Sequence, residues 1–190
     1  MDVNEVTVGQ FKRFAEESGY AYDRWNSVAK YSPTDGHPMI YVSWDDATAY
    51  TQWASKRLPT EAEWEYVARG GLDGKRYPWG DDESVARDHA NYSGTGGKDQ
   101  WEGFPNGGTA PVGSFDYNGY GLYDMEGNVR EWCADRYDAN YYTNSPLNDP
   151  TGPTTGQYRV LRGGAWNNLT KHLRAAYRTY SSPGDRNSST

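Results

Sequence analysis

The sequence predicts a single α+β domain that is rich in loops, with short helices first and short strands later. Three observations support this class. Three capped helix patterns lie within residues 1–71, no helical period continues through residues 72–158, and a strand pattern follows at residues 157–161. At 190 residues, without a visible repeat or linker, the chain has the length of one domain with its own core.

Each helix is predicted from a capping residue that precedes apolar positions at helical spacing. Thr7 with Gln10 has the spacing of a capping box, and Thr60 with Glu63 repeats it. Ser43 is expected to cap the helix between these two. The positions expected to face the core are Phe11, Phe14, Ala47, Tyr50, Ala54, Trp64, Val67 and Ala68.

Residues 72–158 are dense in Gly, Pro, Asn, Asp and aromatic residues, which predicts loops with short strands. Gly70 and Gly71 end the third helix and mark the start of this region. Loops of this length are uncommon inside a compact domain unless a metal ion or a function organises them. Beyond them, Gln157–Leu161 is expected to form a strand that ends at Gly163 and Gly164.

Composition excludes several classes of protein. With 15% aromatic residues, including 17 Tyr and 8 Trp, the core must be built from a few large rings. The net charge of -7 and the lack of a basic stripe argue against a nucleic-acid partner. Cys133 is the only cysteine, which excludes an intrachain disulfide. We expect no transmembrane segment, because no apolar run is long enough. Nothing in the sequence indicates a compartment.

The C-terminal residues 170–190 have an unusual alphabet. Twelve of these 21 residues are Asn, Asp, Ser, Thr, Tyr or His, set among a framework of Leu, Ala, Arg, Pro and Gly. Tyr offers a large amphipathic contact at low entropic cost, and Ser and Asn offer adaptable hydrogen bonds. This composition is typical of a binding surface, and the alternative is a polar terminal loop.

Seven segments together resemble the formylglycine-generating-enzyme family, also called sulfatase-modifying-factor domains. They are EVTVGQF (Glu5–Phe11), VSWDDATAYTQWA (Val42–Ala54), RLPTEAEWEYVARGG (Arg57–Gly71), YPWGD (Tyr77–Asp81), TAPVGSF (Thr109–Phe115), NGYGLYDMEGNVREWCADRY (Asn118–Tyr137) and RVLRGGAW (Arg159–Trp166). The resemblance implies a variant of the C-type lectin fold, with short helices and small antiparallel sheets. That domain usually begins earlier and ends in a GFR strand after the position of Thr190. We therefore expect residues 1–190 to be one domain, incomplete at one or both edges.

Two enzymatic branches of the resembled family depend on residues that this chain lacks. Formylglycine-generating members bind copper through two cysteines in the segment after RGG, and Asn168 and Leu173 occupy those positions here. The sulfoxide synthases add a histidine triad, whereas His37, His89 and His172 form no His-x-x-x-His pair. We expect no copper site, no catalytic residue, and a protein that is not an enzyme.

A third branch ends as this chain does. The variable proteins of diversity-generating retroelements resemble this domain, and their variable positions use AAY-type codons that yield chiefly the alphabet noted above. Asn167, Asn168 and Asn187 fit a framework role equally well, and the alternative for the whole segment is a polar end that does not vary. The resemblance implies these ligand-facing residues: Asn167, Asn168, Thr170, Lys171, His172, Tyr177, Thr179, Tyr180, Ser181, Ser182, Asp185, Asn187, Ser188 and Ser189. It assigns Arg174, Arg178 and Arg186 to the scaffold, where they would donate to backbone carbonyls.

The resemblance also implies two calcium sites in the loops, where carboxylates, Asn and Gly are mixed as hard cations require. The alternative for both is an acidic loop stabilised by water and Arg130. The first site would use the side chains of Asn91 and Glu102 with the carbonyls of Tyr92 and Phe104, and the second the side chains of Asp124 and Glu131 with the carbonyls of Gly127 and Val129.

Two functions follow from these observations. The first is a binding protein whose C-terminal segment displays a diversified surface to a protein or another macromolecule. The second is an oxidoreductase of the formylglycine-generating or sulfoxide-synthase type that acts on a sulfur-containing substrate.

Overall fold

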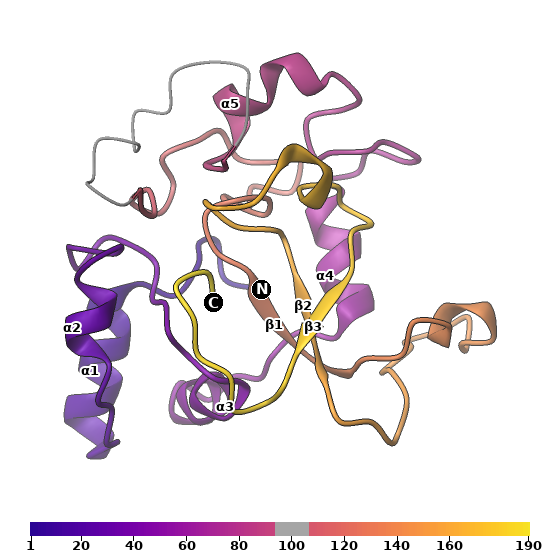
Figure 1. Cartoon of the computed structure of the whole chain (residues 1–190). Helices are drawn as coiled ribbons and strands as arrows, with labels where there is room; N and C mark the ends of the chain where they lie inside the picture. The colour runs from indigo at the N-terminus through magenta and orange to yellow at the C-terminus, as the bar shows by residue number, and fades with distance from the viewer. Residues whose placement is uncertain (94–106) are drawn as a thin grey trace.

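A three-stranded antiparallel sheet lies at the centre of the computed structural model, which describes residues 1–93 and 107–190 (Figure 1). The strands are β1 (Glu131–Arg136), β2 (Arg159–Arg162) and β3 (Thr179–Ser181), in the order β1-β2-β3. In the register, Trp132 pairs with Leu161 and Val160 pairs with Tyr180. The predicted strand at Gln157–Leu161 is therefore present as β2, shifted toward Gly163.

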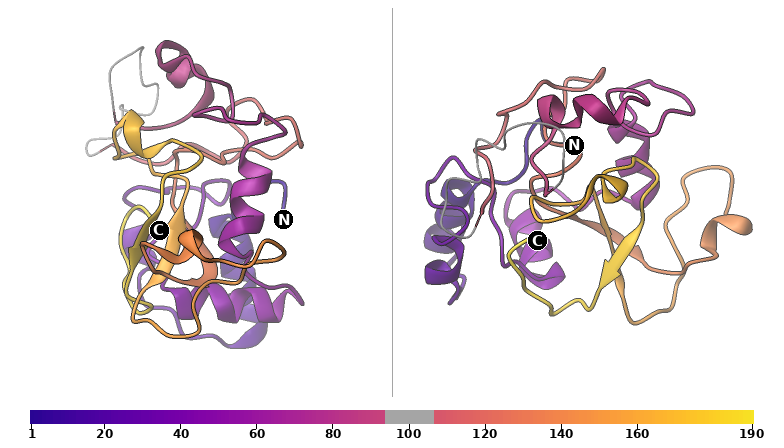
Figure 2. Two further views of the ribbon diagram at one scale, coloured as in Figure 1. Left: turned by 90° about the vertical axis from the view of Figure 1, so that its right-hand side faces the viewer. Right: turned by 45° about the horizontal axis from the view of Figure 1, so that its top comes forward.

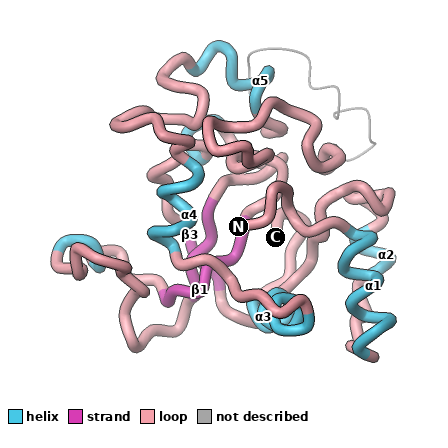
Figure 3. Tube along the Cα trace, turned by 180° about the vertical axis from the view of Figure 1, so that it is seen from behind, coloured by secondary structure: helices cyan, strands magenta, loops and turns pink. Residues whose placement is uncertain are grey.

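Short helices surround the sheet, and loops make up most of the chain (Figure 3). Helix α4 packs against β1 and β2, whereas α1 packs against α3. Helices α1 and α2 lie side by side at one end of the molecule (Figures 1 and 2). The helices are α1 (Val8–Ser18), α2 (Trp25–Val28), α3 (Trp44–Trp53), α4 (Glu61–Ala68) and α5 (Ala86–His89), with 3-10 turns η1 (Glu83–Val85), η2 (Tyr141–Thr143) and η3 (Thr170–His172).

The three predicted helix starts are confirmed. The side chains of Thr7, Ser43 and Thr60 each accept a hydrogen bond from the backbone N–H of the third helical residue. In each case that residue's side chain accepts from the backbone N–H of the cap, which completes a capping box. Gly70 and Gly71 have φ of 55° and 83°, so the left-handed residues expected after α4 are present.

Large rings build the core, as the composition predicts. Phe11, Phe14 and Tyr50 meet between α1 and α3, with the Phe11 and Phe14 ring centroids 5.1 Å apart. Trp64 is fully buried between α4 and the sheet, together with Cys133. Among the eight positions expected to face the core, Phe11, Phe14, Tyr50, Trp64 and Ala68 are buried, whereas Ala47, Ala54 and Val67 are only half-buried.

Two buried carboxylates connect the C-terminal segment to helices from the first third of the chain. Glu61, at the start of α4, accepts from Arg162 at 3.1 Å and from Arg178 at 2.7 and 2.8 Å. Asp46, in α3, accepts from Arg186 at 2.6 and 2.7 Å. Neither carboxylate is more than 1% exposed, so each depends on its arginine partners for charge compensation.

These contacts partly correct the predicted role of the framework arginines. Arg174 does donate to a carbonyl, that of Lys171 at 3.0 Å. Arg178 and Arg186 instead form bidentate pairs with buried carboxylates, and Arg178 adds one carbonyl, that of Asp138. The planar guanidinium suits both kinds of partner, so the sequence alone does not separate them.

The Asp46–Arg186 pair predicts a loss of stability in acid. Burial raises the pKa of Asp46, but hydrogen bonds from Arg186 and Ser43 outweigh it and lower this pKa from 3.8 to about 2. A carboxylate with a lowered folded-state pKa stabilises the fold above its unfolded pKa, and this stability is lost as pH falls from about 4 to about 2.

We expect Arg186→Met to cost roughly 3 kcal/mol at neutral pH, because it leaves a buried charge without its partner. The same variant should lose this part of the acid dependence. Urea unfolding between about pH 2 and 7 measures both effects. Lys12→Met, which breaks the exposed pair with Asp35, is the control and should cost less than about 1 kcal/mol. Equal losses in the two variants would contradict the assignment.

Candidate functional site

The candidate site is the C-terminal segment, defined here as residues 167–190. It begins near α5, runs through η3 and β3, and ends in the interior of the molecule (Figure 1). Leu173 and Ala175 are buried, with Leu173 packed in a cluster that includes Tyr77 and Tyr92. The backbone N–H of Ala175 donates to the carbonyl of Arg76 at 2.8 Å. The segment is therefore held at intervals along its length.

Between these attachment points, most of the predicted ligand-facing residues reach the surface. Tyr180 is 47% exposed, in the middle of β3. In contrast, Ser189 is only 4% exposed. The exposed members of the set are Asn167, Lys171, Tyr180 and Asp185, and the half-buried members are Asn168, Thr170, His172, Tyr177, Thr179, Ser181, Ser182, Asn187 and Ser188.

Residues 187–190 are framework, which makes the prediction of Ser189 as a ligand-facing residue wrong. The carbonyl of Ser189 accepts from the backbone N–H of Arg130 at 2.8 Å. The carbonyl of Asn187 accepts from Tyr41, and that of Ser188 accepts from the indole of Trp166. These bonds hold the chain end in the interior, and Ser and Asn are ambiguous because the same residue types suit a surface loop.

Asn168 is also held by the scaffold. Its side-chain oxygen accepts from Arg130 at 2.9 Å, and its carbonyl accepts from the N–H of Ser93 at 2.8 Å. Asn168 and Leu173 are the positions where the resemblance places the copper-binding cysteines. One is an amide bound to an arginine and the other is a fully buried leucine, so neither offers a soft ligand for copper.

Two local contacts shape the exposed part of the segment. The rings of His172 and Tyr177 meet edge to face at 4.9 Å. Burial, followed by the nearby charges of Lys171, Arg130 and Arg174, lowers the pKa of His172, which therefore favours the neutral form. The carboxylate of Asp185 accepts from the Ser181 hydroxyl and the Ser182 N–H, which closes the turn after β3.

The residues of the second predicted calcium site lie close together. Asp124, with φ of 54°, is 5% exposed, and its Oδ1 has no hydrogen-bond partner among the described residues. Burial raises the pKa of Asp124 to about 6 and that of Glu131 to about 7, and the two charges also oppose each other. Glu5, which accepts from the Val129 N–H at 3.1 Å, is a third carboxylate in this group.

The carboxylates of this group repel one another when they are ionised, and a bound divalent cation would relieve this repulsion. The carbonyls of Met125 and Val129 both lie near Gly163, 3.1 and 3.8 Å from the position that a Cβ would take there. Among the described residues, however, no group of three or more His, Cys, Asp or Glu side chains is arranged to hold a metal ion. A cation would therefore need carbonyls and water as further ligands.

Half of the first predicted calcium site, Glu102 and Phe104, lies outside the described residues. Of the other half, Asn91 is buried, and its Oδ1 has no hydrogen-bond partner among the described residues. The carbonyl of Tyr92 accepts from Arg87 at 2.7 Å. A guanidinium on a predicted ligand oxygen competes with a cation there, so the described half fits calcium less well than the second site.

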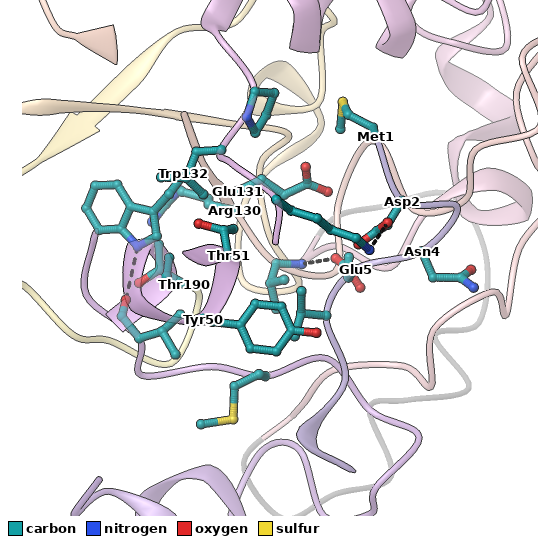
Figure 4. A pocket seen from close by; sticks show the side chains of 18 of the residues that line it. Met1, Asp2, Asn4, Glu5, Tyr50, Thr51, Arg130, Glu131, Trp132 and Thr190 are labelled. Atoms are coloured by element: carbon teal, nitrogen blue, oxygen red, sulfur yellow. Dashed lines mark hydrogen bonds and ion pairs between the residues drawn. The ribbon is translucent and has the colours of Figure 1, made fainter. Parts of the chain in front are cut away.

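A cavity of about 650 Å³ lies beside β1, between the N-terminal residues, α3 and α4 (Figure 4). Its wall is mainly apolar, from residues such as Phe11 and Trp132, and both Glu5 and Glu131 reach it.

The three histidines lie in separate contacts. His37 contacts Thr34, His89 contacts Trp79 and His172 contacts Tyr177. The described residues thus bring together no histidine group for metal or acid–base catalysis.

Fold and framework together define a sulfatase-modifying-factor domain. All of residues 1–190 match the family described as "Sulfatase-modifying factor enzyme 1-like domain", and the chain belongs to this family. It is 48% identical over 160 residues to a formylglycine-generating enzyme of Streptomyces coelicolor, which covers 77% of this chain and 48% of the relative. It is 39% identical over 206 residues to a serine/threonine-protein kinase pkn1 of Chlamydia caviae, covering 99% and 31%. The chain thus spans about half and about a third of these relatives.

Two solved structures are also similar. Treponema denticola variable protein 1, a variable protein of a diversity-generating retroelement, superposes with a TM-score of 0.75 and 25% identity, covering 97% of this chain and 79% of that one. PvdO from Pseudomonas aeruginosa superposes with a TM-score of 0.77 and 28% identity, covering 98% and 75%. The predicted C-type lectin fold of the formylglycine-generating-enzyme type is confirmed. Within the part of the chain that the structure describes, the helices are too short or too polar to cross a bilayer.

Proposed function

We propose that this chain is a ligand-binding display protein, in which the C-terminal segment forms a diversified surface on a lectin-like scaffold. Its partner is a protein or another macromolecule, and not nucleic acid, since the net charge is -7. The proposal extends to this chain the class of the structural neighbour from Treponema denticola.

One observation supports the proposal most strongly. The residues that attach the segment to the scaffold and the residues of the polar alphabet occupy different places in the structure. Leu173, Arg178 and Arg186 attach the segment to the core, to Glu61 and to Asp46. The members of the Asn, Asp, Ser, Thr, Tyr and His alphabet in this segment reach the surface at least in part, except Ser189 and Thr190. A surface whose supports are independent of its exposed side chains can change sequence without loss of the fold.

The cysteine pair that would bind copper in a formylglycine-generating enzyme is absent from this sequence. Asn168 and Leu173 stand in place of the cysteine pair, and Cys133 is fully buried in β1. Burial raises the pKa of the Cys133 thiol, so the reactive thiolate is disfavoured. A single buried thiol does not provide a two-thiolate site.

The alternative function is an oxidoreductase of the formylglycine-generating or sulfoxide-synthase type that acts on a sulfur-containing substrate. The 48% identity to a formylglycine-generating enzyme favours it. Incubation with copper, oxygen and a sulfatase-type cysteine peptide separates the two functions, because only the enzyme converts the cysteine. A bovine relative, 42% identical over 139 residues, is named "Inactive C-alpha-formylglycine-generating enzyme 2", so similarity to this family does not by itself imply the enzymatic activity.

We further propose calcium as a structural cofactor at the second predicted site. Asp124 and Glu131 would supply carboxylate oxygens, and the carbonyls of Gly127 and Val129 would complete the protein ligands. The unpartnered Asp124 Oδ1 and the mutual repulsion of the buried carboxylates support this assignment. Bound calcium would neutralise them and fix the loop that precedes β1.

Calcium should raise the melting temperature, and a chelator should lower it. A ligand that binds only the native state adds RT ln(1 + [L]/Kd), or about 2.7 kcal/mol at a hundredfold excess over Kd. Asp124→Ala should reduce the response to calcium, whereas Asp35→Ala, which removes an exposed carboxylate, should leave it unchanged. Identical melting curves with and without chelator would remove calcium from the proposal.

Positions of the C-terminal segment that reach the surface at least in part and framework positions should respond oppositely to substitution. Lys171→Asn, Thr179→Ser and Ser182→Asn should each change the free energy of unfolding by less than about 0.5 kcal/mol. Leu173→Ala should cost roughly 2–5 kcal/mol, because it opens a cavity among Tyr77, Ala86 and Tyr92. Urea denaturation of the four variants measures this contrast. If the three surface variants unfold as readily as Leu173→Ala, those side chains are packing elements and the display proposal fails.

A further inference from the structure

Three tyrosine rings gather on the sheet around β3, and two of them come from outside the C-terminal segment. The ring of Tyr180 lies 4.3 Å from that of Tyr137 and 4.8 Å from that of Tyr158, measured between centroids. Tyr158 is 40% exposed and Tyr180 is 47% exposed. Both Tyr137 and Tyr158 belong to the connection between β1 and β2, which projects from the side of the molecule (Figures 1 and 2).

Strand pairing explains why these rings meet. Val160 pairs with Tyr180, and Tyr158 lies two residues before Val160, so its side chain falls on the same face of the sheet, diagonal to Tyr180. The backbone N–H of Tyr137 donates to the carbonyl of Tyr158 at 3.0 Å, which places the third ring beside the other two. The three tyrosines are far apart in the sequence, so the sequence alone does not show that their rings meet.

The rings rest on a rigid support. The guanidinium of Arg178 lies 5.1 Å from the ring centroid of Tyr137 and 4.8 Å from that of Tyr142. The same guanidinium is bound to the buried carboxylate of Glu61. Tyr142 is 39% exposed, so it adds a fourth accessible ring at the edge of the group. Rings that are already ordered lose little entropy when a partner binds.

From this arrangement we infer that Tyr137, Tyr142 and Tyr158 form a constant half of the binding surface, whose variable half is β3 and its flanking residues. The partner class is a folded protein. The inference rests on the proposed display function and deepens it, since it assigns binding residues that lie outside the C-terminal segment.

The chemistry of the tyrosine side chain favours a protein partner. Tyrosine is enriched among the residues that dominate protein–protein binding energy, and it joins an apolar ring to a hydrogen-bonding hydroxyl. The constant rings are continuous with the variable strand, so a partner seated on Tyr180 also covers Tyr158. Constant contacts would supply affinity that does not depend on the variable sequence, while the variable residues select the partner.

A display library tests this assignment. The full chain would be displayed on yeast, with Tyr180 and the constant tyrosines left intact, and selected against a glycosylated ribonuclease. Six positions would be randomised within the Asn, Asp, Ser, Thr, Tyr and His alphabet: Lys171, His172, Tyr177, Thr179, Ser181 and Ser182.

In the selected binders, Tyr158→Ser and, separately, Tyr142→Ser should each weaken binding about tenfold, as expected for tyrosine rings that a protein partner covers. Tyr158→Phe keeps the ring and should keep most of the affinity. Tyr117→Ser is the matched control, because Tyr117 is 63% exposed and its ring contacts Tyr123. It should change affinity less than about twofold. Melting curves of all four variants establish that each remains folded.

Binders that respond to Tyr158→Ser and Tyr142→Ser no more than to Tyr117→Ser would overturn the inference while leaving the display function intact. A library that yields no binder would overturn the display function and the inference with it. Binders that lose the ribonuclease when its glycan is removed enzymatically would overturn the assignment of a protein partner in favour of a carbohydrate.

Discussion

The ion pairs of the buried Glu61 carboxylate are the interaction on which the proposed binding surface depends. Glu61 joins three parts of the chain: α4 through its own backbone, β2 through Arg162, and the C-terminal segment through Arg178. Removing one partner of a buried pair usually costs roughly 3–5 kcal/mol, because the other charge stays buried without compensation. The surface therefore has a fixed point that is independent of the side chains it displays.

Under the proposed display function, this arrangement would let one domain tolerate changes of sequence in the C-terminal segment. Arg178 fixes the start of β3, Arg186 fixes the turn that follows it, and residues 187–190 end in the interior. The residues between these points contribute side chains to the surface but few supports to the fold. Elsewhere in the scaffold, short capped helices and arginines that donate to carbonyls, such as Arg159 to Ala134 and Arg162 to Ala175, satisfy a backbone that is mostly loop.

Local signals predicted much of the fold. The capping boxes at Thr7 and Thr60 are encoded within four residues, and both are present as predicted. The positions of β2 and of most core rings followed from periodicity, and the family followed from ordered motifs. Contacts between distant residues could not be predicted in this way. The pairing of Arg186 with Asp46 joins residues 140 positions apart, and neither residue type specifies its partner.

The same limit applies to the candidate site. The alphabet of the C-terminal segment identified its exposed stretch, yet Ser189 is buried because a serine can serve either a surface or a backbone-bonded chain end. Tyr137 and Tyr158 were missed because only the register of β2 with β3 brings them to Tyr180. The available signal was Tyr158 inside the predicted strand Gln157–Leu161, and it is a weak one because tyrosine is common in strands.

Sequencing the part of this gene that encodes residues 167–190, in many cells of one population, tests the central claim most directly. Diversification predicts differences confined to adenines in the codons of residues that reach the surface at least in part, such as Tyr177, Thr179 and Ser182, with the codons for Leu173, Arg178 and Arg186 unchanged. A segment that is identical in every cell, or differences that fall equally on the framework codons, would contradict the account.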